Sequence, residues 1–243
     1  MMSLRRCTSI LLLLVTANGT VYADSFALKA SVAYWDFDFA GDVISSVSLD
    51  DEFRLNDDAG LIAAVALEHP VPLIPNFRAA YTELSDRAET TLSAGFDFNG
   101  EQFTVGQSID SEIDLTHYDF TAYYQLIDIG MDLDVGATAR FFIGEMAVLN
   151  VSEDISAWQP MLYVSTKLGL PFSGTYFGGH VNAGQDIVDY EVHVGWETDA
   201  LIFPAFGVTI GYRSLSIDAG ERDFDVDVNL ESKGVLVSLT AEL

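Results

Sequence analysis

The sequence predicts an all-β protein, a closed antiparallel transmembrane up-and-down β-barrel of about 10 strands, with 8 and 12 as the alternative counts. Three observations predict it. An export signal stands at the N-terminus, ten segments alternate apolar and polar residues, and the links between these segments are short and long in turn.

Residues 1–23 are expected to be a secretory signal peptide. A basic pair, Arg5 and Arg6, precedes a short apolar run over residues 10–15, and a small-residue cleavage site ends at Ala23. The apolar run is far shorter than the roughly 20 residues of a spanning helix. We therefore expect export by the Sec route and cleavage after Ala23, which leaves residues 24–243 as the outer-membrane β-barrel.

The composition is acidic and apolar at once. The chain has 11 Lys and Arg against 37 Asp and Glu, a formal net charge of −26, which excludes nucleic acid as a partner because a polyanion would be repelled. It is also 49% hydrophobic, with 16 Phe and 10 Tyr, which excludes a disordered chain. Cys7, the single cysteine, lies within the predicted signal peptide, so the mature chain is expected to contain no disulfide.

Each predicted strand has apolar residues at every second position, the period of a strand whose two faces meet different surroundings. An even number of strands places both termini at the same end of the barrel, in the periplasm, and closure removes the exposed sheet edges that lipid does not tolerate. The ten segments are 26–34, 61–68, 77–82, 117–125, 131–140, 162–168, 177–183, 190–197, 206–213 and 235–243.

The links between the strands differ in length on the two sides. Short turns are predicted over 68–75, 127–130, 170–174 and 198–204, and mostly longer acidic loops over 40–58, 86–111, 144–156 and 219–231. Short periplasmic turns and long outer loops are typical of barrels in the outer membrane of Gram-negative bacteria. The prolines of the first turn are predicted to stiffen it, because proline fixes φ and lacks a backbone donor.

Some residues near the strand ends need a separate explanation. Ile113 and Leu115 are out of step with Tyr118, Leu215 and Ile217 with Tyr212, and residues 224–230 with Val235, which a bulge or a strand extension beyond the membrane would each explain. Four aromatic residues near strand ends are expected to form interfacial girdles: Trp35, Tyr124, Tyr190 and Trp196.

Four segments carry a family resemblance: 68–76 (EHPVPLIPN), 117–124 (HYDFTAYY), 160–163 (PMLY) and 211–215 (GYRSL). In them the chain resembles a family of uncharacterised small outer-membrane β-barrel proteins of Gram-negative bacteria. The resemblance implies location and architecture, and no site residue. The last strand, with apolar residues at alternate positions up to Leu243, also resembles the C-terminal signal read by the barrel assembly machinery, although most such signals end in Phe.

The polar faces of the strands are predicted to point into the lumen. In a barrel only slightly wider than the eight-stranded ones whose side chains fill the interior, such groups are expected to pair and plug it. A narrow channel for small or cationic solutes is the alternative. The predicted lumen residues are Glu68, Arg78, Asp119, Asp132, Asp134, Arg140, Lys167, His180, Glu191, His193, Glu197 and Arg213.

Two groups invite a metal interpretation. His180 and His193 are predicted to be diagonal neighbours near Glu191, although histidine is also an ordinary lumen filler, and we expect no metal or cofactor. The acidic run over 223–231 has Val228 where an EF-hand requires glycine. A solvated acidic rim is expected instead, and outer loops bridged to lipopolysaccharide by divalent cations remain the milder possibility.

The predicted role is structural or interactive. Outer-membrane barrel enzymes place a nucleophile or an acid/base pair at the rim or on the lipid face, and here the histidines map to the middle of the lumen or to the inner turn. No catalytic residue is therefore predicted, and an outer-membrane hydrolase is the least favoured hypothesis. A monomer is expected, in contact with lipid and lipopolysaccharide.

Overall fold

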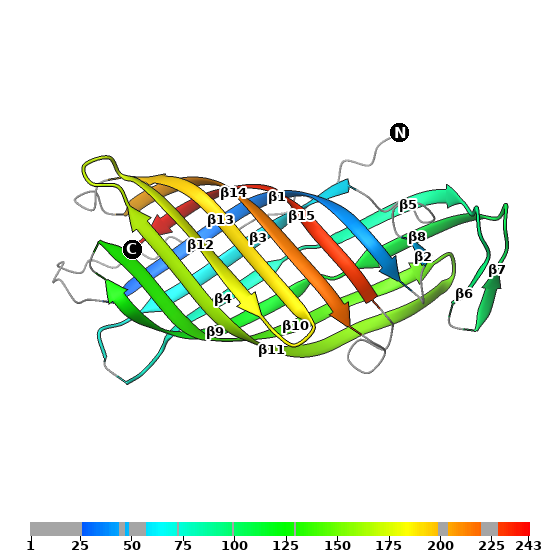
Figure 1. Cartoon of the computed structure of the whole chain (residues 1–243), viewed down its shortest axis with the longest axis horizontal. Helices are drawn as coiled ribbons and strands as arrows, with labels where there is room; N and C mark the ends of the chain where they lie inside the picture. Colours follow the sequence, from blue (N-terminus) through cyan, green and yellow to red (C-terminus); the bar gives the residue numbers. More distant parts are fainter. Residues whose placement is uncertain are drawn as a thin grey trace.

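A computed structural model describes residues 26–43, 47–48, 57–71, 73–98, 100–128, 130–198, 204–219 and 228–243. The predicted signal peptide, residues 1–23, lies outside the described residues. Ten antiparallel strands form a closed barrel, as predicted (Figure 1): β1 (Ala27–Val43), β3 (Asp57–Glu68), β4 (Asn76–Thr82), β9 (His117–Asp128), β10 (Met131–Val148), β11 (Val151–Gly169), β12 (Thr175–Ala183), β13 (Ile187–Glu197), β14 (Ala205–Ala219) and β15 (Val228–Glu242).

The first and last barrel strands close the sheet. β1 pairs with β15 from Lys29 opposite Glu242 to Val43 opposite Val228, and on its other side β1 pairs with β3. Each barrel strand therefore has two neighbours, so the barrel presents no open sheet edge along its wall. No helix long and apolar enough to cross a membrane occurs in the described ranges.

The two ends of the barrel differ. At one end, called the turn end, the links 69–75, 129–130, 170–174 and 198–204 are short, as predicted, and the N-terminus of β1 and the C-terminus of β15 lie there too (Figure 1). At the opposite end, called the hairpin end, the link between β4 and β9 forms four further strands, β5 (Ser85–Thr91), β6 (Phe96–Phe98), β7 (Glu101–Phe103) and β8 (Ser108–Asp114). They extend away from the barrel (Figure 1).

Two predicted outer loops are therefore strands. Residues 144–156 were expected to be a loop, but β10 and β11 continue through them and join in a tight turn at Leu149 and Asn150. β5 and β8 pair over residues 85–114, where a second long loop was expected, and β8 also pairs with the end of β10. In these extensions one face is buried and mostly apolar, at Ile109, Ile113 and Met146, and the other face carries the acidic residues that suggested a loop. β2 (Val47–Ser48) pairs with the end of β1.

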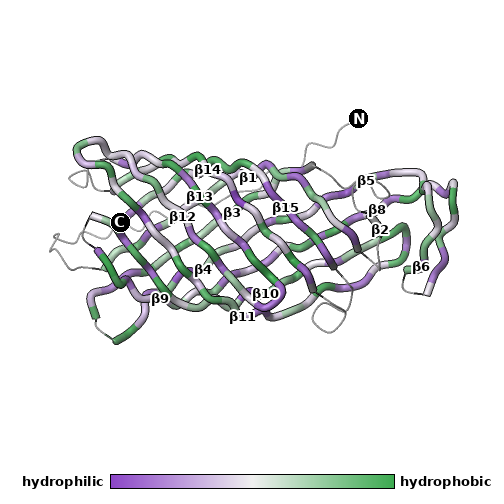
Figure 2. Tube along the Cα trace, in the orientation of Figure 1, coloured by the Kyte–Doolittle hydropathy of each residue, from purple (hydrophilic) through white to green (hydrophobic). Residues whose placement is uncertain are grey.

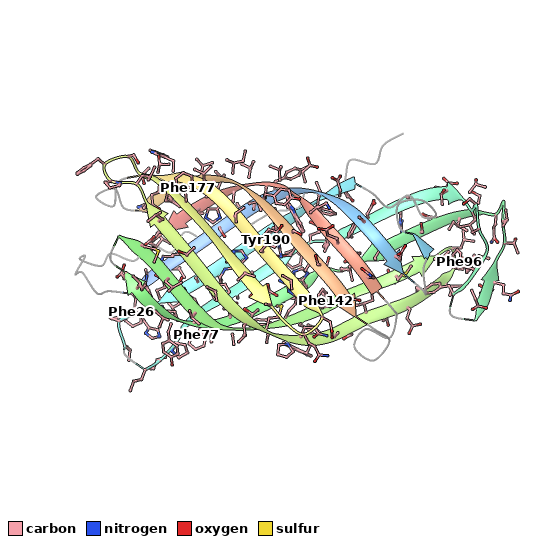
Figure 3. All side chains as sticks on the ribbon, viewed as in Figure 1. Phe26, Phe77, Phe96, Phe142, Phe177 and Tyr190 are labelled. Atoms are coloured by element: carbon pink, nitrogen blue, oxygen red, sulfur yellow. The ribbon has the colours of Figure 1, made fainter. Side chains whose placement is uncertain are left out.

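The outward face of the barrel is apolar. Hydrophobic and hydrophilic residues alternate along the strands (Figure 2). The outward-facing residues include Phe26, Phe77, Phe177 and Tyr190, whose exposed side chains are labelled in Figure 3. Val, Leu and Ile occupy most of the other outward positions of the strands, including Leu162, Val194, Ile210 and Leu239. A single shift of register would turn this face inward, so the alternation fixes the register of each strand.

The residues that were out of step are inward-facing apolar residues on strands whose inward face is polar elsewhere. Leu215 and Ile217 keep the inward phase of Arg213, so β14 is continuous and its inward face changes from polar to apolar. Ile113 and Leu115 likewise share the inward phase of His117 and Asp119, and Tyr118 faces outward. Residues 224–227 lie outside the described residues.

One predicted girdle residue was placed wrongly. Trp35 is 0% exposed and points into the barrel, whereas Tyr124, Tyr190 and Trp196 are exposed as an interfacial girdle requires. The reason is parity: Trp35 follows Tyr34, which faces outward, and successive side chains of a strand point to opposite faces.

Candidate functional site

The interior of the barrel has three layers along its axis. Near the turn end it is polar and holds a cavity, at mid-length it holds a buried charge network, and towards the hairpin end it is apolar. The three layers are the candidate functional site, because they decide what can enter or cross the barrel.

The charge network joins four strands across the lumen. Arg140 on β10 donates from Nε and Nη2 to Asp119 on β9, both at 2.7 Å, and Nη2 also reaches Asp189 on β13 at 2.5 Å. Arg213 on β14 donates to the same Asp189 carboxylate at 2.9 and 2.7 Å, and to the hydroxyl of Thr82 at 3.2 Å. Each carboxylate is thus bound by a guanidinium fork, the geometry that makes these pairs strong.

The network is fully removed from solvent. Arg140 and Asp189 are 0% exposed, and Asp119 and Arg213 are nearly so. Buried charges are tolerated only when paired and hydrogen-bonded, and here two cations face two anions. The four residues therefore form a neutral set that spans the lumen as one unit.

A neutral hydrogen-bonded chain lies beside the network. The hydroxyls of Thr121 and Thr138 are 2.8 Å apart, and Thr138 donates to the side-chain oxygen of Asn182 at 2.8 Å. These residues come from β9, β10 and β12 and are all buried. The polar cross-section of the lumen is therefore occupied by side chains that bond to one another.

Towards the hairpin end the interior is filled by apolar side chains, called the apolar layer. The Arg213 guanidinium lies over the Trp35 ring at 4.7 Å from its centroid, which joins the charge network to this layer. Trp35 packs against Phe37 with ring centroids 4.9 Å apart. Further buried members of the layer are Phe39, Leu84, Ile113, Leu115, Phe142, Met146, Ile155, Leu215, Ile217, Leu230 and Leu236.

The apolar layer corrects the expectation of an interior that is polar throughout. The inward residues of β1, β10 and β14 become apolar beyond the charge network, so this part of the interior resembles the core of a soluble protein. The layer continues outward along the link between β4 and β9 through Leu92, Phe98, Phe103 and Ile109. The described parts of this extension are therefore packed, and not simply attached to the rim.

Near the turn end the lumen holds a cavity of about 260 Å³. Two ion pairs line it, Lys29 with Glu68 and Lys167 with Glu197, each at 2.7 Å, and Tyr123 donates to Glu68 at 2.9 Å. Its other polar residues are Ser31, Arg78, Gln125, Asp132, Asp134, Tyr163, Ser165, Thr166, Tyr176, His193, Thr240 and Glu242. The cavity has both signs of charge, and its ion pairs are partly exposed to water.

The two predicted histidines do not converge on a metal site in the described residues. His193 lies 2.8 Å from Glu191 through Nδ1, and His180 lies opposite Glu191 in the register of β12 and β13. The group with metal-ligand spacing is instead His117, Asp119 and Asp189. Arg140 and Arg213 already occupy both of these carboxylates, and their positive charges would repel a cation.

The histidines also offer no rim acid/base pair. His117 is fully buried, with Nδ1 2.9 Å from the carbonyl of Leu115, and His69 lies in the turn between β3 and β4, with Nε2 3.1 Å from the carbonyl of Pro75. A substrate could not reach the first, and the ring nitrogens of the second bond to backbone groups of its own turn.

The sequence reasoning missed several interior residues, and parity would have found them. Asp189 precedes the predicted strand 190–197 but has the phase of Glu191 and His193, so extending that strand by one residue places it inward. Lys29 shares the phase of Ser31 in the same way. Tyr123 and Tyr163 were not among the predicted lumen residues, yet both are buried inside the barrel.

No protein-family model and no curated protein matches the sequence. In structure the chain is similar to the attachment invasion locus protein Ail of Yersinia pestis, solved with the heparin analogue sucrose octasulfate (10% identity, TM-score 0.36, covering 90% of this chain and 99% of Ail). It is also similar to Neisserial surface protein A (12%, 0.33, 89% and 96%) and to a FadL homologue of Pseudomonas aeruginosa (10%, 0.35, 90% and 90%). With so few identities, the function has to be argued from this barrel's own residues.

Proposed function

We propose that this protein is a monomeric integral barrel of the Gram-negative outer membrane, closed to solutes, with a structural or surface-interaction role. The outward belt of exposed apolar side chains supports the membrane location, because a soluble barrel would not cover its wall with Val, Leu, Ile and aromatic residues. The short turns then face the periplasm and the β5–β8 extension faces the outside.

The observation that carries the proposal is that the charge network and the apolar layer follow one another along the lumen, and both fill it. Arg140, Asp189 and Trp35 are each 0% exposed, so water does not reach these side chains where they cross the lumen. An ion would have to break guanidinium–carboxylate pairs and then cross packed aromatic side chains, which offer it no ligands. The remaining polar cavity near the turn end is a blind vestibule in this proposal.

What the closed barrel would present to the outside is its hairpin end. Asp36 and Asp38 lie exposed on the outer face of β1 beyond Tyr34, and Glu145 lies opposite Asp154 in the register of β10 and β11. The proposal includes contact of this acidic surface with lipopolysaccharide phosphates through divalent cations, and insertion of the chain by the barrel assembly machinery. A catalytic role is not part of it.

Single-channel recording on the refolded mature barrel in a planar bilayer tests the proposal. We expect no steady conductance steps, and a matched variant, Trp35→Ala combined with Arg213→Ala, should produce them by removing side chains from both layers. Regular steps from the unmodified protein would contradict the closed barrel and favour the alternative, a narrow channel for small or cationic solutes.

A further inference from the structure

Two turns at the periplasmic end carry apolar side chains in full contact with solvent. In the turn between β3 and β4, Leu73 is 91% exposed, and in the turn between β11 and β12, Phe172 is fully exposed. Neither turn has a charged residue between positions 70 and 75 or between 170 and 174. Such side chains at the tip of a loop in water would be unfavourable, so a partner surface is indicated.

The backbone at both tips is unusual for the residues present. Leu73 has φ 71° and Phe172 has φ 64°, the left-handed region that favours glycine and that bulky side chains rarely adopt. Conformational strain of this kind persists where the surrounding structure or a function maintains it. At both tips this backbone carries an apolar side chain that is exposed.

The turn between β3 and β4 is attached to the outer wall of the barrel. Tyr124, an outward-facing residue of β9, donates its hydroxyl to the carbonyl of Leu73 at 3.0 Å. Figure 1 shows this turn hanging outside the wall and not across the lumen. The apolar belt also continues beyond Tyr124 towards the periplasmic end, through the exposed Leu126 and Ile127. Leu73 is therefore continuous with the lipid-facing surface.

The turn between β11 and β12 has the same arrangement. Gly174, two residues after Phe172, has φ 65°. A Cβ atom added at Gly174 would lie 3.1 Å from the indole nitrogen of the exposed Trp196, so the turn lies against an aromatic residue at the edge of the belt. The Ser173 hydroxyl donates to the carbonyl of Leu170 at 3.1 Å, which satisfies part of the backbone within the turn. Leu170 is itself exposed, so the apolar surface reaches the tip.

We propose that these two turns are membrane anchors that insert Leu73 and Phe172 into the inner, phospholipid leaflet of the outer membrane. The occupant is lipid hydrocarbon because the tips are uncharged, continuous with the belt, and flanked by Tyr124 and Trp196, residue types that prefer the interface. This inference rests on the proposed membrane location. A periplasmic protein that covers the same tips is the competing occupant.

Site-directed spin labelling tests the proposal, since the predicted mature chain has no cysteine. Leu73→Cys and Phe172→Cys variants of the mature barrel are labelled with a nitroxide, reconstituted in phosphatidylethanolamine and phosphatidylglycerol vesicles, and measured for collision with oxygen and with a water-soluble nickel chelate. Two exposed positions serve as controls, Leu162→Cys on the outward apolar face of β11 and Gln185→Cys in the turn between β12 and β13.

We expect the labels at 73 and 172 to collide preferentially with oxygen, with a ratio closer to that of position 162 than to that of position 185. If position 162 reports lipid while 73 and 172 match 185, the anchor proposal is wrong and the barrel proposal stands. If position 162 itself reports water, the membrane location fails. Because the purified sample contains only lipid, a lipid signal at the tips would also exclude the need for a protein partner.

Discussion

Removing the shared carboxylate of the charge network should be the most damaging single polar change in the barrel. In Asp189→Ala, Arg213 loses both of its carboxylate bonds and keeps only the bond to Thr82, while Arg140 loses one of its three. Leaving a buried charge without its partner costs about 3–5 kcal/mol. We expect a loss of that size in the free energy of unfolding.

The assay is reversible urea unfolding of the barrel refolded in phospholipid vesicles, followed by circular dichroism. The matched control is Glu197→Gln, which removes one carboxylate from the partly exposed pair with Lys167 and should cost about 0–1 kcal/mol. The double variant Asp189→Ala with Arg213→Ala should cost less than the sum of the two single variants, by about 0.5–3 kcal/mol. Similar losses for Asp189→Ala and Glu197→Gln would refute a desolvated network.

Three further outcomes follow from the same interior and wall. Val194→Arg, on the exposed outer face, should cost about 2–4 kcal/mol in the same vesicles, and His193→Arg, which faces the cavity, should cost less; equal losses would contradict the assigned faces. Phe142→Ala should cost about 3–5 kcal/mol by leaving a hole in the apolar layer, and a loss below about 1 kcal/mol would mean that this layer is loosely packed. Gly234→Ala should lower the folded fraction seen as a mobility shift on unheated gels, because the added Cβ would lie 1.8 Å from the carbonyl oxygen of Asp36; a wild-type fraction would show that β1 shifts easily.

The strand count could be predicted from simple periodicity, and the end that carries the short turns from the lengths of the links. Val192, Val194 and Trp196 alternate with His193 and Glu197, and that alternation alone places them on opposite faces. The rule is local, so it needs no knowledge of which strands are neighbours. For this reason the rule assigned the outward-facing apolar residues of these strands correctly.

The interior was predicted less well because its chemistry depends on contacts between distant segments. Leu215 and Ile217 were recognised as out of step, but their common role with Trp35 and Phe142 becomes visible only when β1, β10 and β14 surround one space. Asp189 similarly belongs to the charge network through its bond to Arg140, 49 residues away in the sequence. Periodicity assigns a face to each residue, whereas the partners across a lumen depend on closure.

The arrangement of the apolar layer has a consequence for the order of assembly. Its residues come from both ends of the barrel sequence, Trp35 and Phe37 on β1 and Leu230 and Leu236 on β15, and these strands meet only at the final seam. Before that seam pairs, the indole of Trp35 would face water and the layer would lack one of its walls. Pairing of β1 with β15 and burial of the apolar layer are thus a single step. An intermediate stalled before this pairing would have a hydrated interior and few buried apolar contacts to stabilise it.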